Sequence, residues 1–430
     1  MKSFSILTLG CKVNQYESEA LAGSLVKRGF SQLEWASEAD FYIINGCAVT
    51  AKAAAKTRQQ TRSIKRMHPE AKVILIGCYS GADPSRAKEI ADLVLDNNTK
   101  PYLADYLEAM LRLEICSLQI GEGNYAFYDG SSQHEHTRPL VKIQDGCNMY
   151  CAYCAIPQMR GPERSRHLDE IADEVNFLSE RGYHELILTG IHLSRWGKDF
   201  EPQVGLDHLL THLLSLPGIP RLRLSSVEPT DIDERMLKLF SRKDPHLCPH
   251  LHLPLQSGCD ATLKRMGRRY LTADYEELVK KLRLINPLIS ISTDLIVGFP
   301  GETEEEFAQT FDFCQRMNFS RMHIFSYSSR PGTRASLMAD QQLSSIKEER
   351  SKRLHAAAHQ MAVNYASSLV GQKVKVLLEQ QNEPGQASGY SEYYVECLID
   401  GFDSIPSQGK IVELLVTSCQ GEKIKGEIIG

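Results

Sequence analysis

Short apolar runs alternate with helical stretches along most of the chain, and this alternation restricts the fold more than any other feature. In the first third, the runs at 5–9, 41–45 and 73–76 are each followed by Gly-Cys. The intervening stretches, 17–28 and 51–67, are rich in helix formers or repeat apolar residues at helical intervals. Apolar runs separated by helices are typical of buried parallel strands. Residues 1–130 are therefore expected to form an open parallel sheet of the flavodoxin or Rossmann kind.

A second strand–helix series follows a polar, aperiodic segment at 131–139, which we interpret as a linker. Its helices include 169–181 and 302–317, and Thr303 with Glu306 forms a capping box for the second of these. Six strand–helix repeats indicate a partial parallel barrel, an incomplete version of the eight-fold (βα) barrel, over residues 140–370. The six candidate strands are 140–144, 185–189, 221–225, 250–255, 289–297 and 322–327.

The last part of the chain has a different pattern. A capping box at Ser345 and Glu348 opens a long helix that ends at Gly371. Short strand-like runs follow at 373–379, 393–399, 410–417 and 423–429, separated by Gly, Pro and Asn. We expect residues 371–430 to form a small antiparallel β-barrel. The whole chain is thus predicted to be an α/β protein of three domains.

Composition narrows the compartment and the chemistry. Hydrophobic residues make up 42% and charged residues 24%, as in an ordinary globular protein. No apolar run approaches the roughly 18 residues of a membrane span, and the run at 4–9 is too short for a signal peptide. A cytoplasmic protein is expected, with no membrane partner. Because the cytosol keeps thiols reduced, the twelve cysteines favour metal binding or redox chemistry over disulfides.

One group of cysteines is compact. Cys147, Cys151 and Cys154 form a CxxxCxxC motif after a predicted strand. Three thiolates can ligate three irons of a cubane cluster and leave the fourth iron open to a substrate or cofactor. The alternative is a structural zinc site with a distant fourth ligand.

A second group emerges from the predicted fold. Cys11, Cys47 and Cys78 each follow a parallel strand, and the carboxyl ends of such strands meet at one sheet edge, where open α/β sheets bind ligands. Three converging thiolates could hold a second cubane with an open iron. The alternative is that they are small buried residues at strand ends.

Together these motifs resemble the radical S-adenosylmethionine (SAM) superfamily and, over nearly the whole chain, its methylthiotransferase family. The aromatic Tyr153 before the third cysteine of CxxxCxxC belongs to the resemblance. The last domain is similar to the TRAM module of RNA-modifying enzymes, and Gly-Cys-Lys-Val-Asn-Gln at 10–15 resembles the MtaB branch. Further matching segments are 9–18, 45–50, 160–166 and 293–303.

The resemblance implies an enzyme with two [4Fe-4S] clusters and SAM as cofactors. One SAM would donate a methyl group, and another would yield a 5′-deoxyadenosyl radical at the open iron of the 147–154 cluster. The implied substrate is C2 of N6-threonylcarbamoyladenosine beside the tRNA anticodon. An electron donor of flavodoxin or ferredoxin type is implied as a partner, and the oligomeric state is left open.

Other functions stay open from the residues alone. Sister branches of the family act on isopentenyladenosine in tRNA or on an aspartate of a ribosomal protein. A non-catalytic iron–sulfur sensor or RNA-binding regulator would share the cysteines but would need no SAM pocket.

Several residues at predicted strand ends are candidate SAM contacts. Gly190 would allow close approach of the methionyl amine, and the Arg166 guanidinium suits the SAM carboxylate. Ordinary turn or cap roles are the alternative for each, and His250 and His252 are expected to be hydrogen-bonded core side chains. The remaining candidates, at or near strand ends facing the same mouth, are Ser225, Ser226, Gln256 and Asp294.

Local basic stretches are the candidates for RNA contact, because the net charge of −5 indicates no global preference for nucleic acid. Residues 51–68 carry six basic side chains and no acidic one. The last domain is acidic, with five lysines against nine acidic residues, so its RNA contact is expected to use stacking by Tyr390, Tyr393 and Tyr394 or shape alone. The candidate phosphate contacts, with a solvated helix face as the alternative, are Arg58, Arg62, Lys65, Arg66, Arg268 and Arg269.

Overall fold

A computed structural model describes residues 2–112, 136–383, 386–400 and 408–429. The chain forms two compact units. The first comprises Met1–His134 together with Asp145–Arg166 and Ser328–Ser336, and the second comprises Glu135–Gln144, His167–Tyr327 and Leu337–Gly430. These units do not follow the three predicted domains, because the CxxxCxxC segment belongs to the same unit as the N-terminal sheet.

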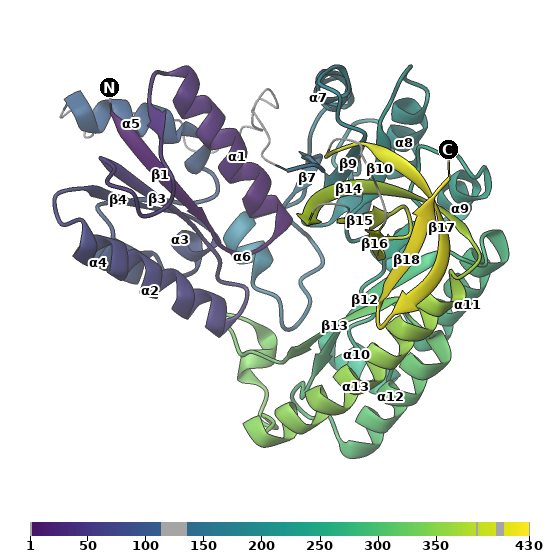
Figure 1. The fold of residues 1–430 in the computed structure, drawn as a ribbon. Coiled ribbons are helices and arrows are strands. Elements are labelled where there is room, and N and C mark those ends of the chain that lie inside the picture. The colour runs from purple at the N-terminus through teal and green to yellow at the C-terminus, as the bar shows by residue number, and fades with distance from the viewer. Residues whose placement is uncertain (1, 113–135, 384–385, 401–407, 430) are drawn as a thin grey trace. The chain divides into compact units, whose positions relative to one another are not determined.

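The first unit is built on a five-stranded parallel sheet of order β2-β1-β3-β4-β5. Figure 1 shows α1 and α5 on one face of this sheet and α2 and α4 on the other, which confirms the predicted open α/β sheet. The strands are β1 Ser3–Thr8, β2 Ser31–Gln32, β3 Phe41–Gly46, β4 Lys72–Gly77 and β5 Leu93–Leu95. The helices are α1 Lys12–Lys27, α2 Ala51–Met67, α3 Cys78–Ala82, α4 Pro84–Ile90, α5 Leu103–Arg112 and, from the CxxxCxxC segment, α6 Ile156–Arg160.

One of these helices begins at a cysteine and another directly after one. The first helix starts at Lys12, earlier than the predicted residue 17, because Cys11 is its N-cap. Cys78 is the first residue of α3. Because each strand is followed closely by a helix, both cysteines lie after the carboxyl ends of strands, β1 and β4.

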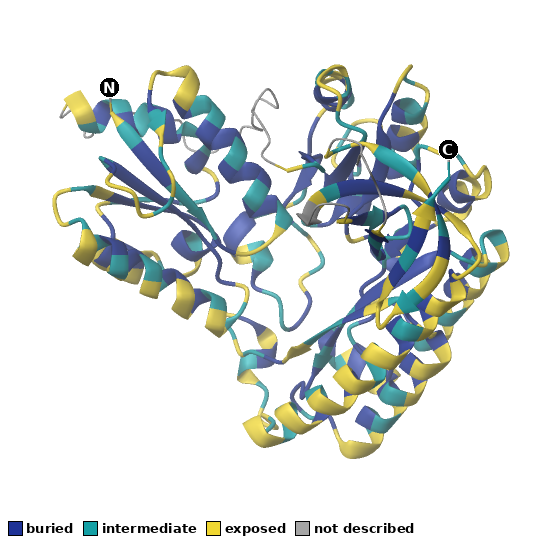
Figure 2. Cartoon of the chain, viewed as in Figure 1, coloured by how far each residue is buried: buried dark blue, intermediate teal, exposed yellow. Residues whose placement is uncertain are grey.

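The second unit contains the six predicted parallel strands. They form two three-stranded sheets, β10-β9-β6 and β11-β12-β13, linked by isolated parallel bridges such as Ser226–His252. Their apolar faces pack beneath the covering helices, so most of these strands are dark in Figure 2, whereas Arg321–Ser326 is mostly intermediate or exposed. The strands are β6 Leu140–Lys142, β9 Glu185–Thr189, β10 Arg221–Leu224, β11 His250–His252, β12 Ser290–Val297 and β13 Arg321–Ser326. The helices are α7 Leu168–Glu180, α8 Leu206–Leu214, α9 Glu234–Ser241, α10 Asp260–Met266, α11 Thr272–Ile285, α12 Glu304–Met317 and α13 Ser344–Ser368.

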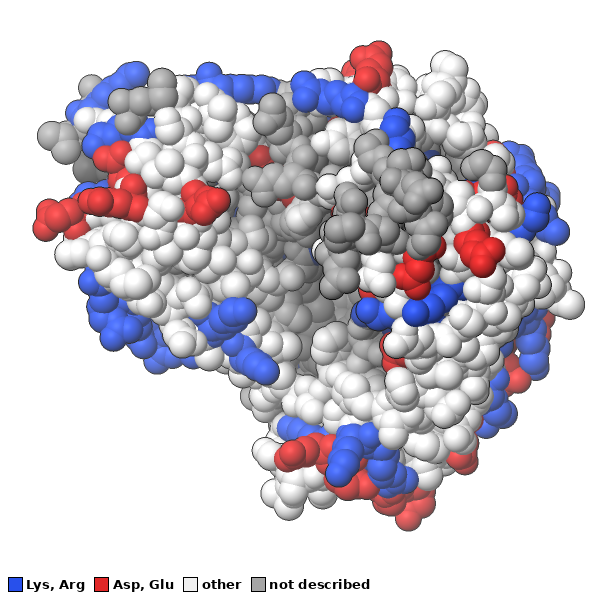
Figure 3. All heavy atoms as spheres, in the orientation of Figure 1, with Lys and Arg blue, Asp and Glu red and all other residues white. Residues whose placement is uncertain are grey.

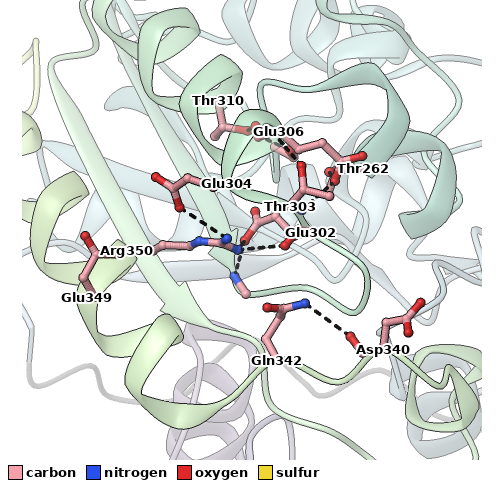
Figure 4. Close-up of polar contacts among 12 residues, drawn as sticks. Thr262, Glu302, Thr303, Glu304, Glu306, Thr310, Asp340, Gln342, Glu349 and Arg350 are labelled. Atoms are coloured by element: carbon pink, nitrogen blue, oxygen red, sulfur yellow. Dashed lines mark hydrogen bonds and ion pairs between the residues drawn. The ribbon is translucent and has the colours of Figure 1, made fainter.

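The loop after β12 is fixed by two helices (Figure 4). Thr303 and Glu306 form the predicted capping box of α12. The Arg350 guanidinium of α13 donates to the Glu302 carbonyl at 3.0 Å and to its carboxylate at 2.7 Å. The predicted capping box at Ser345 is wrong, because α13 begins one residue earlier with Leu343 as a cap that makes no side-chain hydrogen bond.

A closed five-stranded barrel of order β14-β15-β16-β18-β17 ends the chain. It has one strand more than predicted, and its β16–β18 pair is parallel, so the barrel is not wholly antiparallel. The missed strand, Gln386–Ser391, carries few apolar residues. The strands are β14 Lys373–Glu383, β15 Gln386–Ser391, β16 Glu396–Asp400, β17 Ile411–Gln420 and β18 Lys423–Ile428.

Buried ion pairs join this barrel to the first residues of the parallel strands. The Glu185 carboxylate accepts from Arg221 and Arg223 at 2.5 and 2.7 Å. The same two guanidinium groups donate to backbone carbonyls in the barrel, among them that of Tyr390 at 3.2 Å. At the end of the predicted linker, Arg138 pairs with Glu379 at 2.7 Å. Residues 131–135 of that linker lie outside the described part of the chain.

No helix among the described residues is long and apolar enough to cross a membrane.

Candidate metal centres

The first cysteine trio lies at one edge of the N-terminal sheet, as predicted. Cys11, Cys47 and Cys78 follow the adjacent strands β1, β3 and β4. Cys47 and Cys78 are buried, while Cys11 is exposed. Desolvation, together with the nearby Cys78 and Cys11 thiols, raises the pKa of Cys47 to about 11. Three thiols that follow adjacent strands at one sheet edge are suited to share a metal centre that holds them as thiolates.

Two glycines make room for this edge. Gly10 has φ +111°, and a β-carbon there would lie 2.8 Å from Cβ of Cys47. Gly77 has φ +89°, and a β-carbon there would lie 2.2 Å from Oδ1 of Asn45. Only glycine tolerates both the left-handed backbone and the crowding. A β-carbon at Gly46 would lie 2.6 Å from Cγ2 of Thr57, so the repeated Gly-Cys pattern has a steric reason at all three of its occurrences.

The second trio lies in a loop that its own backbone holds in shape. The Cys147 N–H donates to the Gly161 carbonyl at 3.2 Å, and the Cys154 N–H donates to the Cys151 carbonyl at 3.0 Å. Residues 334–335 support the loop from outside, since the Ala335 N–H donates to the Ala152 carbonyl at 2.8 Å. Cys151 is buried, and Cys147 and Cys154 are partly exposed. The three thiols can therefore ligate a group that approaches from solvent.

The segment that follows the second trio packs into the hydrophobic core that holds two cysteines of the first. Helix α6 starts two residues after Cys154, and its Met159 packs with Ala155, Cys47 and Cys78 in a single buried cluster. The Asn97 amide donates to the Met159 carbonyl at 2.7 Å and lies 3.8 Å from the Cys78 sulfur. Sequence spacing gave no sign that the two trios belong to one compact unit.

Two predicted SAM contacts lie in this first unit. Tyr153 is partly exposed within the cysteine loop. Arg166 is buried, and its guanidinium donates to the Tyr16 hydroxyl at 3.5 Å.

The other predicted SAM contacts lie in the second unit. Ser225 Oγ is buried and has no hydrogen-bond partner among the described residues. Ser226 is exposed and Gln256 is partly buried, with φ +67°. Gly190 has a packing reason of its own, because a β-carbon there would lie 3.1 to 3.2 Å from three atoms of Gln144.

Asp294 lies in a polar cluster that the sequence did not reveal. It pairs with His252 at 3.2 Å, and His323 on the next strand completes a group whose ligand atoms lie within 4.8 Å of one another. His250 and His252 both bond the Ser292 hydroxyl, at 3.1 and 3.0 Å, which confirms that they are hydrogen-bonded. His323 was missed because a single histidine on a strand carries no spacing signal.

Four predicted RNA contacts lie on α2, and Figure 3 shows Lys and Arg side chains gathered over this part of the first unit. The buried face of this helix consists of Ala54, Thr57, Thr61 and Ile64. Arg62 and Arg66 are exposed. Arg58 lies over the Tyr79 ring at 5.9 Å, and Lys65 pairs with Asp92 at 3.3 Å.

The remaining predicted RNA contacts differ in how far they are exposed. Arg269 is exposed, but the Arg268 side chain is 4% exposed and pairs with Glu228, so it is unsuited to phosphate contact. Tyr390 and Tyr394 are not free to stack on bases, because Arg138 lies over both rings at 4.6 and 5.2 Å. Tyr393 is likewise only partly exposed.

Known proteins place the chain in a class. The sequence model of the Radical SAM superfamily matches residues 141–314, and that of the uncharacterized protein family UPF0004 matches residues 3–96. The structure of the radical SAM methyltransferase TsrM from Kitasatospora setae, with cobalamin and a [4Fe-4S] cluster bound, aligns with a TM-score of 0.59. At 15% identity over 90% of this chain and 81% of that one, the likeness supports the fold. The fold and the cysteine loop define a radical SAM enzyme.

Similar proteins of known activity show to which family of radical SAM enzymes the chain belongs. The threonylcarbamoyladenosine tRNA methylthiotransferase MtaB of Thermotoga maritima is 39% identical over 100% of this chain and 99% of its own length. MtaB of Bacillus subtilis is 34% identical over 97% and 94%. A tRNA-2-methylthio-N(6)-dimethylallyladenosine synthase of Moorella thermoacetica is 33% identical over 100% and 98%. The chain belongs to the methylthiotransferase family of radical SAM enzymes, which confirms the predicted family, its MtaB-like resemblance and the cofactors SAM and [4Fe-4S].

Proposed function

We propose that this enzyme transfers a methylthio group to C2 of N6-threonylcarbamoyladenosine in tRNA. Full-length similarity to two MtaB proteins carries the proposal. The presence of both cysteine trios in one unit supports it, because the reaction needs a radical source and a sulfur donor.

Each trio is assigned a centre. We assign Cys147, Cys151 and Cys154 to the cluster that binds SAM, and Cys11, Cys47 and Cys78 to a second cluster that presents sulfur. When bound, SAM and the clusters supply the radical, the methyl group and the sulfur, none of which an amino-acid side chain can provide. The protein binds and orients these groups. The glycines at 10 and 77 keep space open at the first trio, and the backbone bonds of the 147–154 loop hold the second.

The remaining assignments extend the same proposal. The SAM contacts predicted from the sequence are kept as proposed contacts: Tyr153, Arg166, Ser225, Ser226, Gln256 and Asp294. Gly190 is kept only as a position that must stay small. Arg62, Arg66 and Arg269 are assigned to tRNA phosphates, with Arg58 and Lys65 beside them on α2. A reduced flavodoxin or ferredoxin in the cytoplasm is proposed as the electron donor.

The direct test is nucleoside analysis of tRNA. Anaerobically reconstituted enzyme is incubated with SAM, reductant and tRNA that carries threonylcarbamoyladenosine, and the digested nucleosides are analysed by mass spectrometry. Conversion to the 2-methylthio derivative is expected. Parallel reactions contain tRNA with isopentenyladenosine or ribosomal protein. Exclusive modification of either alternative substrate would overturn the nucleoside assignment, and SAM that is never cleaved would favour a sensor or regulator.

A further inference from the structure

Arg160 occupies an unusual position in the first unit. It is the last residue of α6, six residues after Cys154, and its side chain is fully buried. One guanidinium nitrogen donates to both carboxylate oxygens of Asp145, at 3.0 and 3.1 Å, and to Glu17 at 3.0 Å. The other donates to Glu17 at 3.1 Å and to the Asn14 amide oxygen at 2.7 Å. A guanidinium with this many partners is held in one orientation.

These partners flank the cysteines of both trios. Asp145 lies two residues before Cys147, so Arg160 ties together the two ends of the cysteine loop. On the other side, Asn14 and Glu17 lie in the first two turns of α1, which Cys11 caps. The Asn14 amide oxygen that accepts from Arg160 also lies 4.0 Å from the Cys11 sulfur.

A second buried cation extends the network to the third cysteine of the first trio. Lys100 Nζ lies 2.5 Å from the Glu17 carboxylate and 2.5 Å from the Asn97 amide oxygen. The Asn97 amide nitrogen in turn lies 3.8 Å from the Cys78 sulfur. A continuous polar chain thus runs from the 147–154 loop through Arg160 to residues beside Cys11 and Cys78.

The charges of this network balance. Arg160 and Lys100 offset Glu17 and Asp145, so these four buried side chains together carry no net charge. Arg160 donates to the Asn14 amide oxygen, which lies 4.0 Å from the Cys11 sulfur, so its positive charge lies close to the first trio. Loss of this cation would leave one uncompensated carboxylate in a site that must also hold thiolates.

We propose that Arg160 is a positioning residue for both cysteine trios, holding the loop of the second against the sheet edge of the first and supplying the positive charge that the first centre needs. This inference rests on the proposed assignment of a cluster to each trio. Neutral replacement of Arg160 should make the first cluster harder to reduce, because a more negative environment disfavours an added electron.

The test uses the full-length protein, reconstituted anaerobically, with Cys147, Cys151 and Cys154 replaced by Ala so that only the first cluster gives a signal. The midpoint potential and the EPR spectrum of that cluster are compared between Arg160 and R160Q. A more negative potential and an altered spectrum are expected in R160Q. R160K keeps the charge but loses the two-pronged geometry, so it should restore most of the potential.

The second measurement is the coupling between radical formation and product formation, that is, the amount of methylthio product formed per 5′-deoxyadenosine released. It uses protein with all six cysteines. Both R160Q and R160K should form less methylthio product per 5′-deoxyadenosine released, because a displacement of about 1 Å can cost on the order of 10²-fold in rate. If R160Q does not fold, R160K alone tests this part.

R223Q is the matched control, since Arg223 is also fully buried and paired with a buried carboxylate, Glu185, but lies in the second unit. A merely structural arginine should reduce thermal stability and leave the first cluster's potential and spectrum unchanged. R160Q behaving like R223Q, with unchanged potential and coupling, would overturn the role of Arg160. Absence of any cluster when Arg160 is intact would instead overturn the ligand assignment on which the inference rests.

Discussion

Arg160 and Glu17 are 143 residues apart in sequence, yet their fully buried side chains are joined by hydrogen bonds of 3.0 and 3.1 Å. Through this pair the segment that carries Cys147, Cys151 and Cys154 becomes part of the compact unit that carries Cys11, Cys47 and Cys78. The two proposed centres of a two-cluster enzyme are thus built into one body. The predictions below separate the contributions of its parts.

Replacement of Cys147, Cys151 and Cys154 by Ala should abolish reductive cleavage of SAM. The iron content should fall by about half, because a three-thiolate site at Cys11, Cys47 and Cys78 remains. Iron and sulfide analysis together with 5′-deoxyadenosine chromatography measures both effects. Complete loss of iron would contradict independent sites and would mean that the shared core around Met159 needs both clusters.

The basic face of α2 should contribute to tRNA affinity. Charge reversal of the exposed pair in R62E/R66E should weaken binding and reduce the slope of log K against log salt by about one unit for each lost phosphate contact. Binding isotherms at several salt concentrations provide the slope.

The matched control is a second double variant, in which two exposed basic residues four positions apart on and beside another helix are reversed in charge. K238E/R242E on and beside α9 changes the net charge equally and should leave the slope close to that of the unaltered protein. Equal effects of the two double variants would assign the α2 face to solvent.

Glu185 should stabilise the junction between the parallel strands and the terminal barrel. Although burial opposes ionisation, Arg223 and Arg221 lower the pKa of Glu185 from 4.5 to about 2. E185Q removes one partner of a buried ion pair and should reduce the free energy of unfolding by about 3–5 kcal/mol. Denaturant unfolding measures the loss, and E276Q, in an exposed pair with Lys280, should cost at most about 1 kcal/mol.

The pH dependence of this effect has a defined sign. Because the folded-state pKa lies below the ordinary value, the stabilisation is fully present above pH 4.5 and is lost as the pH falls toward 2. The difference in unfolding free energy between the unaltered protein and E185Q should therefore be the same at pH 7 and pH 5.5 and should shrink only below pH 4.5. A difference that already shrinks between pH 7 and pH 5.5 would contradict the assigned pKa.

The sequence predicted the elements that periodicity and local chemistry determine. The three Gly-Cys strand ends, the six parallel strands and the Thr303 capping box each depend on residues close together in the chain, and the structure confirms them. The sequence could not predict that residues 145–166 belong to the same unit as the N-terminal sheet. That grouping depends on ion pairs between distant residues such as Arg160 and Glu17.

The sequence also could not predict which of these side chains are exposed to solvent. Arg268 and Arg269 are neighbours of the same type, yet Arg268 pairs with Glu228 from another strand end and only Arg269 faces solvent. The Arg138 guanidinium lies over the rings of Tyr390 and Tyr394. This contact was not predicted, because Arg138 was assigned to a linker. His323 gained significance only when β12 and β13 brought it beside Asp294.

The central claim is that the first trio holds the sulfur-donating centre. Its most direct test is the protein in which Cys11, Cys47 and Cys78 are replaced by Ala together, assayed for 5′-deoxyadenosine and for methylthiolated nucleoside in the same reaction. The account predicts that SAM is still cleaved, since Cys147, Cys151 and Cys154 are intact, and that no methylthiolated adenosine forms. Full methylthio product from this variant would contradict the donor role and would return the three cysteines to packing at strand ends.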